Sequence, residues 1–197
     1  FLIWLRGGDA SNAAGLRYLF VHIFGGLCLL GGIVIHATSG GGIAFSSLPH
    51  TGLGPTLILI GFLLNAAVPP LHAWLADAYP EATVTGIVFL SVFTTKTAVY
   101  ALVRGFPGMT ILIMLGAIMA VYGIVYAMME NDTRRLLSYH IISQVGYMVA
   151  GVGLGSELAL NGSVSHAFTH ILYKGLLFMG TGAVMFMTGK RRLSELG

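Results

Sequence analysis

Residues 165–187, SHAFTHILYKGLLFMGTGAVMFM, form a long apolar run that carries one lysine, Lys174, well inside it. A second run, IVFLSVFTTKTAVYALV at residues 87–103, carries Lys96 in the same way. Apolar runs of this kind predict helices that cross a lipid bilayer. A lysine near the centre of a membrane helix costs roughly 2.5 to 3.5 kcal/mol even on the most lenient scale. We therefore expect both lysines to serve a function, and they indicate a chain that moves ions.

Two histidines, His166 and His170, precede Lys174 at steps of four residues. Because an α-helix has 3.6 residues per turn, the three side chains fall within an arc of about 80° on one helix face. The spacing therefore predicts a lipid-embedded helix with one face lined by proton-exchanging groups.

The composition places the chain among membrane proteins. Hydrophobic residues make up 56% of its 197 residues, charged residues make up 9%, and the mean hydropathy is +0.86. A soluble domain would carry about 25% charged residues. Cys28 is the single cysteine, so we expect no disulfide framework, no thiolate metal cluster and no nucleic-acid partner. The chain starts with FLIWL, which resembles the last turn of a helix, so we expect a piece of a longer protein.

Breaks rich in polar residues, Gly or Pro divide the chain into spans that predict an all-α, polytopic membrane helix bundle with about six transmembrane helices. The second span contains Pro69 and Pro70, which should break its helix because proline lacks a backbone donor and clashes with the preceding turn. The alternative is that this helix ends near Val68 and that residues 71–79 form a surface segment. The predicted spans are residues 13–37, 54–76, 82–104, 109–130, 134–154 and 160–188.

The basic residues outside these spans are distributed unequally. If the six spans alternate in direction, seven of the eight basic residues share one side and only Arg104 lies on the other. Positive charge marks the cytoplasmic face, so the loops at residues 6–12, 77–81, 130–134 and 189–197 should be cytoplasmic. The seven residues are Arg6, Arg17, Arg134, Arg135, Lys190, Arg191 and Arg192.

Lys96 has a polar environment in its own sequence, because Thr94, Thr95 and Thr97 flank it. Threonine hydroxyls can orient an ammonium group or hold water beside it. A lysine in a partly dry site can release its proton. The alternative is that the Lys96 side chain extends along its stem to the membrane interface.

Several further residues are accessory candidates. Asp77 and Glu81 follow the broken span and could collect protons, although Glu81 could equally support a helix that starts near Ala82. We expect Arg134 and Arg135 to be topological anchors and Asp132 to cap the next helix. The remaining accessory candidates are Asn65, His72 and His140.

The histidines suit a metal or haem poorly. His166 and His170 have the spacing of a shared metal site, but Glu157 is the only nearby carboxylate and lies outside the span. His22 and His36 could stack two haems only if another span offered a matching pair, and none does. We therefore expect no metal and no cofactor, and a simple hydrogen bond to a neighbour for His22.

Three long motifs carry a resemblance to a known family: LHAWLADAYPEATVTGIVFLSVFTTKTAVYALVRGF at 71–106, NDTRRLLSYHIISQVGYM at 131–148 and ELALNGSVSHAFTHILYKGLLFMGTGAV at 157–184. They resemble the antiporter-like subunits shared by Mrp-type multisubunit cation/proton antiporters, respiratory NADH:quinone oxidoreductase (complex I) and membrane-bound hydrogenases. The third motif looks most like the D-type member of the Mrp antiporter subunits. The resemblance covers nearly the whole chain.

The resemblance implies that residues 1–197 are part of a single proton-translocating transmembrane domain, at about helices six to eleven of a fourteen-helix subunit. Lys96 matches the family's lysine on the eighth helix, and Lys174 matches a lysine that some members carry on the eleventh. The family also pairs a glutamate on the fifth helix, which would lie upstream of FLIWL, with a lysine on the broken seventh helix. Here Asn65 stands at that lysine position, and an amide can bind water but cannot hold a transferable charge.

The sequence thus supports a proton-translocating subunit of a cation/proton antiporter, with Lys96, His166, His170 and Lys174 as its relay. The subunit would have no catalytic site of its own. It would lie in a bacterial or archaeal cell membrane with other membrane subunits as partners, and it would move H⁺ and, in an antiporter of the Na⁺/H⁺ type, Na⁺. The second hypothesis is a redox-driven pump subunit of an NADH- or hydrogen-oxidising enzyme, with redox cofactors on partner chains. A purely structural scaffold would leave the two intramembrane lysines unexplained.

Overall fold

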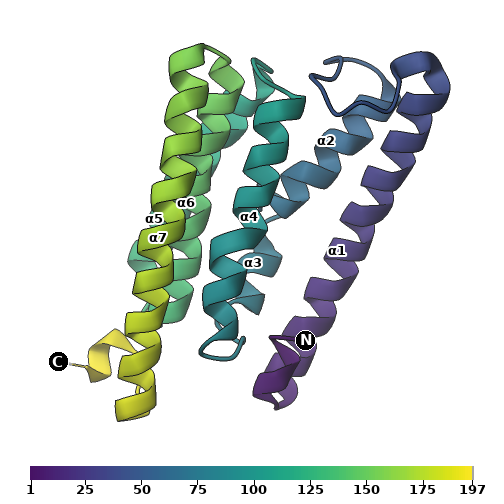
Figure 1. Cartoon of the computed structure of the whole chain (residues 1–197). Helices are drawn as coiled ribbons and strands as arrows, with labels where there is room; N and C mark the ends of the chain where they lie inside the picture. The colour runs from purple at the N-terminus through teal and green to yellow at the C-terminus, as the bar shows by residue number, and fades with distance from the viewer. Residues whose placement is uncertain (197) are drawn as a thin grey trace.

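The fold is a bundle of helices, as a computed structural model that describes residues 1–196 shows. Within these residues there is no strand, only one isolated bridge between Asp132 and Arg192, so the predicted all-α class is confirmed. Figure 1 shows the long helices side by side, with the chain running up and down between two ends and both termini at the same end. The helices are α1 (Asp9–His36), α2 (Leu53–Asn65), α3 (Ala73–Ala78), α4 (Gly86–Gly105), α5 (Ile111–Met129), α6 (Thr133–Leu154) and α7 (Glu157–Thr188), with short turns η1 (Trp4–Arg6), η2 (Ala37–Gly41) and η3 (Leu193–Glu195).

The helix lengths agree with membrane crossing. Four helices in the described part of the chain are long and apolar enough to span a bilayer, and α2 is a shorter apolar helix. The 22-residue α6 fills another predicted span, and α2 and α3 together fill the sixth. Large apolar side chains such as Phe20, Leu27 and Phe186 lie exposed on the outside of the bundle, where lipid would cover them. The four long apolar segments are Asp9–Gly41, Gly86–Gly105, Ile111–Met129 and Glu157–Thr188.

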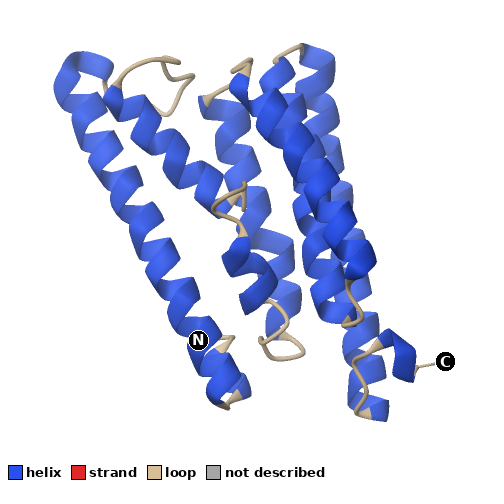
Figure 2. Ribbon diagram, turned by 180° about the vertical axis from the view of Figure 1, so that it is seen from behind, coloured by secondary structure: helices blue, strands red, loops and turns tan. Residues whose placement is uncertain are grey.

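The second span is broken, as its two prolines predict. Helix α2 ends at Asn65 and α3 starts at Ala73, so the break includes Pro69 and Pro70; the loop between the two helices is visible in Figure 2. Trp74 donates its indole N–H to the carbonyl of Leu64 at 3.0 Å, which satisfies an acceptor freed by the break.

Residues 71–79 are not a surface segment, so that alternative is wrong. Trp74 is 3% exposed, and Leu75 and Tyr79 are fully buried. Tyr79 also donates its hydroxyl to the carbonyl of Leu90 in α4 at 2.7 Å. The short helix after the break is therefore part of the core of the bundle.

The start of α4 differs from the prediction. The helix begins at Gly86 rather than near Ala82, and the Thr83 hydroxyl accepts a hydrogen bond from the Gly86 amide at 3.0 Å. Glu81 lies several residues before the first turn, so its predicted role at the helix N-terminus is wrong. Helix α6 starts as predicted, because the Asp132 carboxylate accepts hydrogen bonds from the amides of Arg134 and Arg135 at 2.9 and 3.2 Å.

Helices α5 and α6 pack against each other along a line of small residues. A Cβ atom on Gly116 would lie 2.5 Å from the Gly146 carbonyl oxygen, and one on Gly146 would lie 2.6 Å from the Ala120 amide nitrogen. The two backbones therefore approach as closely as small-residue interfaces allow in membrane proteins. This pairing fixes α6, which carries two of the side chains described below.

Candidate functional site

Lys174 is completely buried in α7 at 0% exposure. Its ammonium group donates a hydrogen bond to the carbonyl oxygen of Leu137 in α6 at 3.0 Å, and it lies 5.9 Å from the centre of the Phe178 ring. No acidic side chain forms an ion pair with it in the described residues. A backbone carbonyl is thus the partner that holds this amine in the interior.

Lys96 is the second buried lysine, at 5% exposure in α4. Its amine donates to the carbonyl of Ser91 at 2.6 Å, on the same helix, so the side chain does not extend to the interface. The Thr97 hydroxyl donates instead to the Phe93 and Thr94 carbonyls, at 3.1 and 2.9 Å. The expected contact of the neighbouring threonine hydroxyls with the ammonium group is therefore wrong; the bond to a backbone carbonyl takes its place.

His170 is fully buried next to the two lysines. Within residues 1–196, neither of its ring nitrogens has a hydrogen-bond partner. Its ring meets Tyr173 edge-on at 4.9 Å between centroids, and Lys96 and Lys174 both lie within electrostatic range of it. The two lysines also interact electrostatically with each other. The structure therefore brings Lys96, His170 and Lys174 into one buried group from α4 and α7.

His166 lies one turn before His170 on α7, with 6.1 Å between the ring centroids. Its Nε2 atom is 3.0 Å from the side-chain oxygen of Gln144 in α6. The hydroxyl of Tyr173 donates to the same oxygen at 3.3 Å. The sequence analysis did not single out Gln144, because nothing in one sequence indicates which residue of another helix meets a histidine.

Two accessory histidines lie on other elements. His140 in α6 interacts electrostatically with Lys174 and has a buried Nδ1 atom without a partner in the described chain. His72, at the start of α3, meets the Tyr122 ring edge-on at 4.5 Å. His140 therefore adjoins the buried group, whereas His72 lies where the break meets α5.

Asn65 lies at the end of α2 and donates its amide to the Gly61 carbonyl at 3.1 Å. It lines a cavity of about 400 Å³ between α1, α2 and α4, together with His22 and Thr94. His22 bonds the Tyr18 carbonyl at 2.9 Å, the neighbour contact that the sequence analysis expected. This cavity is polar in part, and its lining contains neither lysine.

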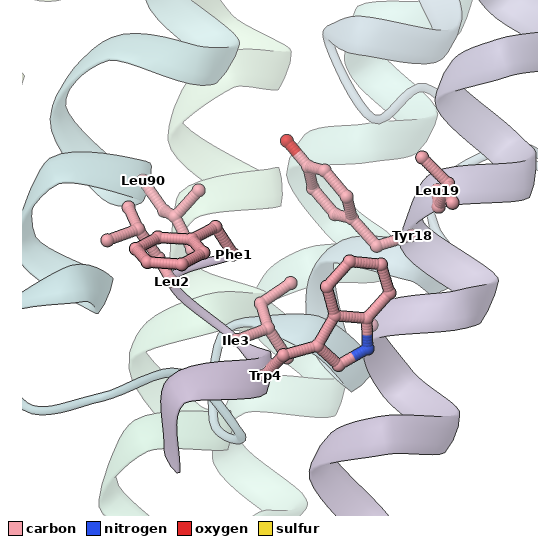
Figure 3. Close-up of a pocket in the computed structure, with 8 residues that line it drawn as sticks. Phe1, Leu2, Ile3, Trp4, Tyr18, Leu19 and Leu90 are labelled. Carbon is pink, nitrogen blue, oxygen red and sulfur yellow. The ribbon is translucent and has the colours of Figure 1, made fainter. Parts of the chain in front are cut away.

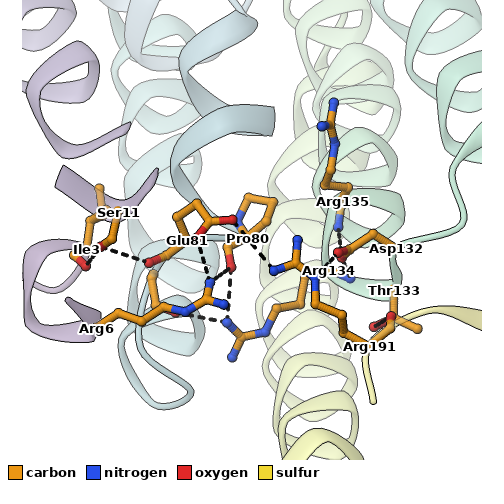
Figure 4. Close-up of polar contacts among 11 residues, drawn as sticks. Ile3, Arg6, Ser11, Pro80, Glu81, Asp132, Thr133, Arg134, Arg135 and Arg191 are labelled. Carbon is orange, nitrogen blue, oxygen red and sulfur yellow. Dashed lines mark hydrogen bonds and ion pairs between the residues drawn. The ribbon is translucent and has the colours of Figure 1, made fainter. Parts of the chain in front are cut away.

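Asp77 and Glu81 lie at the end of the bundle where the termini are, not in the buried group. Asp77 pairs with Arg17 at 3.2 Å, while Glu81 pairs with Arg6 at 2.9 Å and with Arg191 at 3.7 Å. Figure 4 shows Glu81 among the arginines. Both carboxylates therefore contribute to a network of ion pairs that ties four parts of the chain together.

Arg134 is the largest departure from the sequence analysis at this end. It is 1% exposed, and its guanidinium donates to the carbonyls of Pro80 and Ala82 at 3.2 and 2.9 Å (Figure 4). Arg135 pairs with Glu130 at 3.1 Å and remains partly exposed, as an anchor would. The expectation that Arg134 is a surface anchor is wrong, because the loop between α3 and α4 folds over it.

An apolar cavity of about 260 Å³ lies near the N-terminus, where Phe1, Trp4 and Tyr18 face one another (Figure 3). It offers little for proton chemistry beyond the Tyr18 hydroxyl. Across residues 1–196, no three His, Cys, Asp or Glu side chains are grouped so that they could hold a metal ion. The buried lysines and histidines are therefore the candidate site.

Comparison with known proteins agrees with this geometry. Residues 1–197 match the family described as NADH:quinone oxidoreductase/Mrp antiporter, TM. The chain is similar to the D-type member of the Na(+)/H(+) antiporter subunits of Alkalihalophilus pseudofirmus, with 30% identity over 100% of this chain and 44% of that protein. It is also similar to the N-type member of the NADH-quinone oxidoreductase subunits of Desulforudis audaxviator, with 31% identity over 96% of this chain and 42% of that protein.

A solved structure shows the same fold. A chain in the Mrp complex from Dietzia sp. DQ12-45-1b superposes with a TM-score of 0.87 and 27% identity, covering 93% of this chain and 37% of that one. The present chain thus spans less than half the length of the relatives that it matches.

Proposed function

Because this chain belongs to the NADH:quinone oxidoreductase/Mrp antiporter transmembrane family, we propose that it is part of a proton-translocating membrane subunit of a multisubunit cation/proton antiporter. The buried group of Lys96, His170 and Lys174 is the observation that carries this proposal. Burying two amines without acidic partners is costly, and intramembrane ionisable residues mark proton and ion pathways. A scaffold would have no use for them.

The proposed relay moves a proton between α4 and α7 through the imidazole of His170. A protonated Lys96 gives its proton to one ring nitrogen of His170, which leaves a neutral amine and an imidazolium. The imidazolium then releases the proton on its other nitrogen to neutral Lys174. The two ring nitrogens of His170 are buried without partners in the described chain, so both are free for these transfers, directly or through water.

His166 and His140 extend this relay within the same region, and both interact with a buried lysine. Asn65 and His72 lie near the break, where water could reach the relay through the cavity that Asn65 lines. Asp77 and Glu81 already have arginine partners, so we propose that they hold the end of the bundle together and contribute to proton collection only secondarily.

A second candidate function is a pump subunit in an NADH:quinone oxidoreductase or membrane-bound hydrogenase. The similarity to the NADH-quinone oxidoreductase relative favours it, because that identity equals the identity to the antiporter relative within one percentage point. The two candidates differ in what drives the proton. An antiporter moves protons in response to a Na⁺ gradient alone, whereas a redox-driven complex requires an electron donor and acceptor.

We place the basic end of the bundle in the cytoplasm and the full protein in a bacterial or archaeal cell membrane. The protein would act with other membrane subunits, surrounded by lipid, and move H⁺ in exchange for Na⁺. The distribution of the basic residues supports the orientation, since the loops that carry most of them meet at one end of the bundle (Figure 1).

The experiment is transport by the complete complex in sealed vesicles, with Lys174→Ala in the intact subunit. We expect proton-coupled transport to fall by about 100-fold or more, as for loss of a general acid–base group, while the complex still assembles. Lys190→Ala is the matched control, because Lys190 is exposed and donates only to the Glu195 carbonyl. Normal transport by correctly assembled Lys174→Ala protein would contradict the proposal. A Na⁺ gradient applied without an electron donor then separates the two candidates.

A further inference from the structure

Gln144 is a polar residue in α6 whose single side-chain oxygen meets two groups of α7. His166 Nε2 lies 3.0 Å from this oxygen and the Tyr173 hydroxyl lies 3.3 Å from it. His166 and Tyr173 are seven residues apart, so they lie two turns apart on one helix face. An amide oxygen has two lone pairs, and these two donors use both.

We propose that Gln144 is a positioning residue that keeps a proton on Nε2 of His166, so that His166 exchanges its relay proton only through Nδ1. This inference rests on the proposed proton relay. The amide oxygen is an acceptor only, so it pairs with an Nε2–H and not with a bare ring nitrogen. Which nitrogen of a histidine carries the proton is set by the hydrogen bond that the other nitrogen makes.

The arrangement suits a group that must gain and lose a proton repeatedly. Neutral His166 with a proton on Nε2 and the imidazolium form both donate Nε2–H to Gln144. The bond at 3.0 Å therefore persists through the cycle, and the ring does not need to turn. Nδ1 has no hydrogen-bond partner among the described residues, so it is the nitrogen available for transfer.

The charged and titratable neighbours of His166 come from three helices. Lys96 of α4 interacts with it electrostatically, His170 of α7 lies 6.1 Å away between ring centroids, and Tyr147 of α6 lies 6.4 Å away. None of them bonds Nε2 in residues 1–196, so the Gln144 amide alone determines the tautomer.

The direct test is nitrogen-15 NMR of the histidines in the full-length protein in lipid. The His166 signals are assigned by their loss in His166→Asn. We expect neutral His166 to carry its proton on Nε2 in the unchanged protein, and to shift toward a mixture of tautomers in Gln144→Leu. A proton on Nδ1 in the unchanged protein, or an unaltered tautomer in Gln144→Leu, would overturn the inference.

Two more variants separate positioning from structure. Gln144→Glu keeps an acceptor at the same place and adds a charge that favours the imidazolium, so the pH midpoint of transport should move upward by about one unit or more. Tyr173→Phe removes the second donor but leaves the bond to His166, so the His166 tautomer should not change. If Gln144→Glu transports with an unshifted midpoint, Gln144 does not act through His166. If His166→Asn transports normally while the NMR result holds, the relay proposal fails and the tautomer assignment stands.

Discussion

The Lys174 ammonium group of α7 donates a hydrogen bond to the Leu137 carbonyl of α6 at 3.0 Å. Lys96 does the same with a carbonyl of its own helix, at Ser91 and 2.6 Å. A carbonyl dipole stabilises a buried ammonium less than a carboxylate would, since it carries no net charge. Both amines can therefore lose their proton without leaving an unpaired carboxylate behind. This distinguishes the site from a structural ion pair.

Lys96 should be more important for transport than Asn65. We expect Lys96→Ala to reduce proton-coupled transport by about 100-fold, because it removes a group that gives up and takes back the proton. Asn65→Ala should have a smaller effect, since Asn65 is uncharged and only lines the cavity between α1, α2 and α4. Lys96→Arg should not restore transport, because arginine stays protonated. Transport in vesicles measures all three variants. A larger loss in Asn65→Ala, or full activity in Lys96→Arg, would remove Lys96 from the relay.

Arg134 should be essential for stability rather than for proton transfer. It is buried and donates to the carbonyls of Pro80 and Ala82. Arg134→Ala leaves both carbonyls without that partner, and hydrogen bonds to charged groups contribute about 1.5 to 3 kcal/mol each. We expect the free energy of unfolding of the intact protein to fall by about 2 to 4 kcal/mol in a detergent-based unfolding assay. Arg135→Ala is the control, because Arg135 is partly exposed and its pair with Glu130 contributes about 1 kcal/mol or less. Equal losses in the two variants would contradict the role given to Arg134.

The contrast between Lys174 and Arg134 shows what the sequence can predict. Lys174 lies inside a long apolar run, so its burial follows from hydropathy alone. Arg134 lies at the boundary of a span, where hydropathy predicts a surface anchor. Its burial depends on Pro80 and Ala82, which are more than fifty residues away in the chain. The helices and their order were therefore predictable, whereas contacts between distant segments were not.

Gln144 illustrates the same limit within the candidate site. The spacing of His166 and Lys174 on one helix predicts that they share a face, because helical periodicity relates residues of the same helix. Gln144 meets His166 only because α6 and α7 pack in one particular register. The start of α4 could not be predicted either, since the cap formed by Thr83 depends on how the chain turns after the broken span.

Close packing of α5 on α6 should make Gly146 intolerant of substitution. A Cβ at this position would lie 2.6 Å from the Ala120 amide nitrogen and 2.7 Å from the Gly116 carbonyl oxygen, both in the backbone. We expect Gly146→Ala to lower the free energy of unfolding by about 1 to 3 kcal/mol, as overpacking does. Gly162→Ala is the matched control in α7, because a Cβ there meets nothing within 4 Å. That change should be neutral or stabilise the helix by about 0.5 to 1 kcal/mol. Unchanged stability in Gly146→Ala would mean that the two helices do not pack this closely.

The basic end of the bundle should face the cytoplasm. Seven of the eight basic residues outside the predicted spans lie in segments near this end, and an excess of Lys and Arg marks cytoplasmic loops. Two single-cysteine variants test the orientation in intact cells after Cys28 is replaced by Ser. Ser47→Cys lies in the exposed loop between α1 and α2, and Arg192→Cys lies in the exposed segment after α7. Arg192 is preferable to Arg191, because Arg191 forms ion pairs with Asp132 and Glu81.

A membrane-impermeant maleimide added from outside should label Ser47→Cys at once. Arg192→Cys should be labelled only after the cells are made permeable, which also serves as the control that its thiol is reactive. The two positions lie at opposite ends of the bundle, so they must respond in opposite ways if the chain crosses the bilayer as the helices run (Figure 1). Labelling of Arg192→Cys from outside, with Ser47→Cys protected, would invert the orientation. Labelling of both from outside would contradict the membrane-spanning arrangement itself.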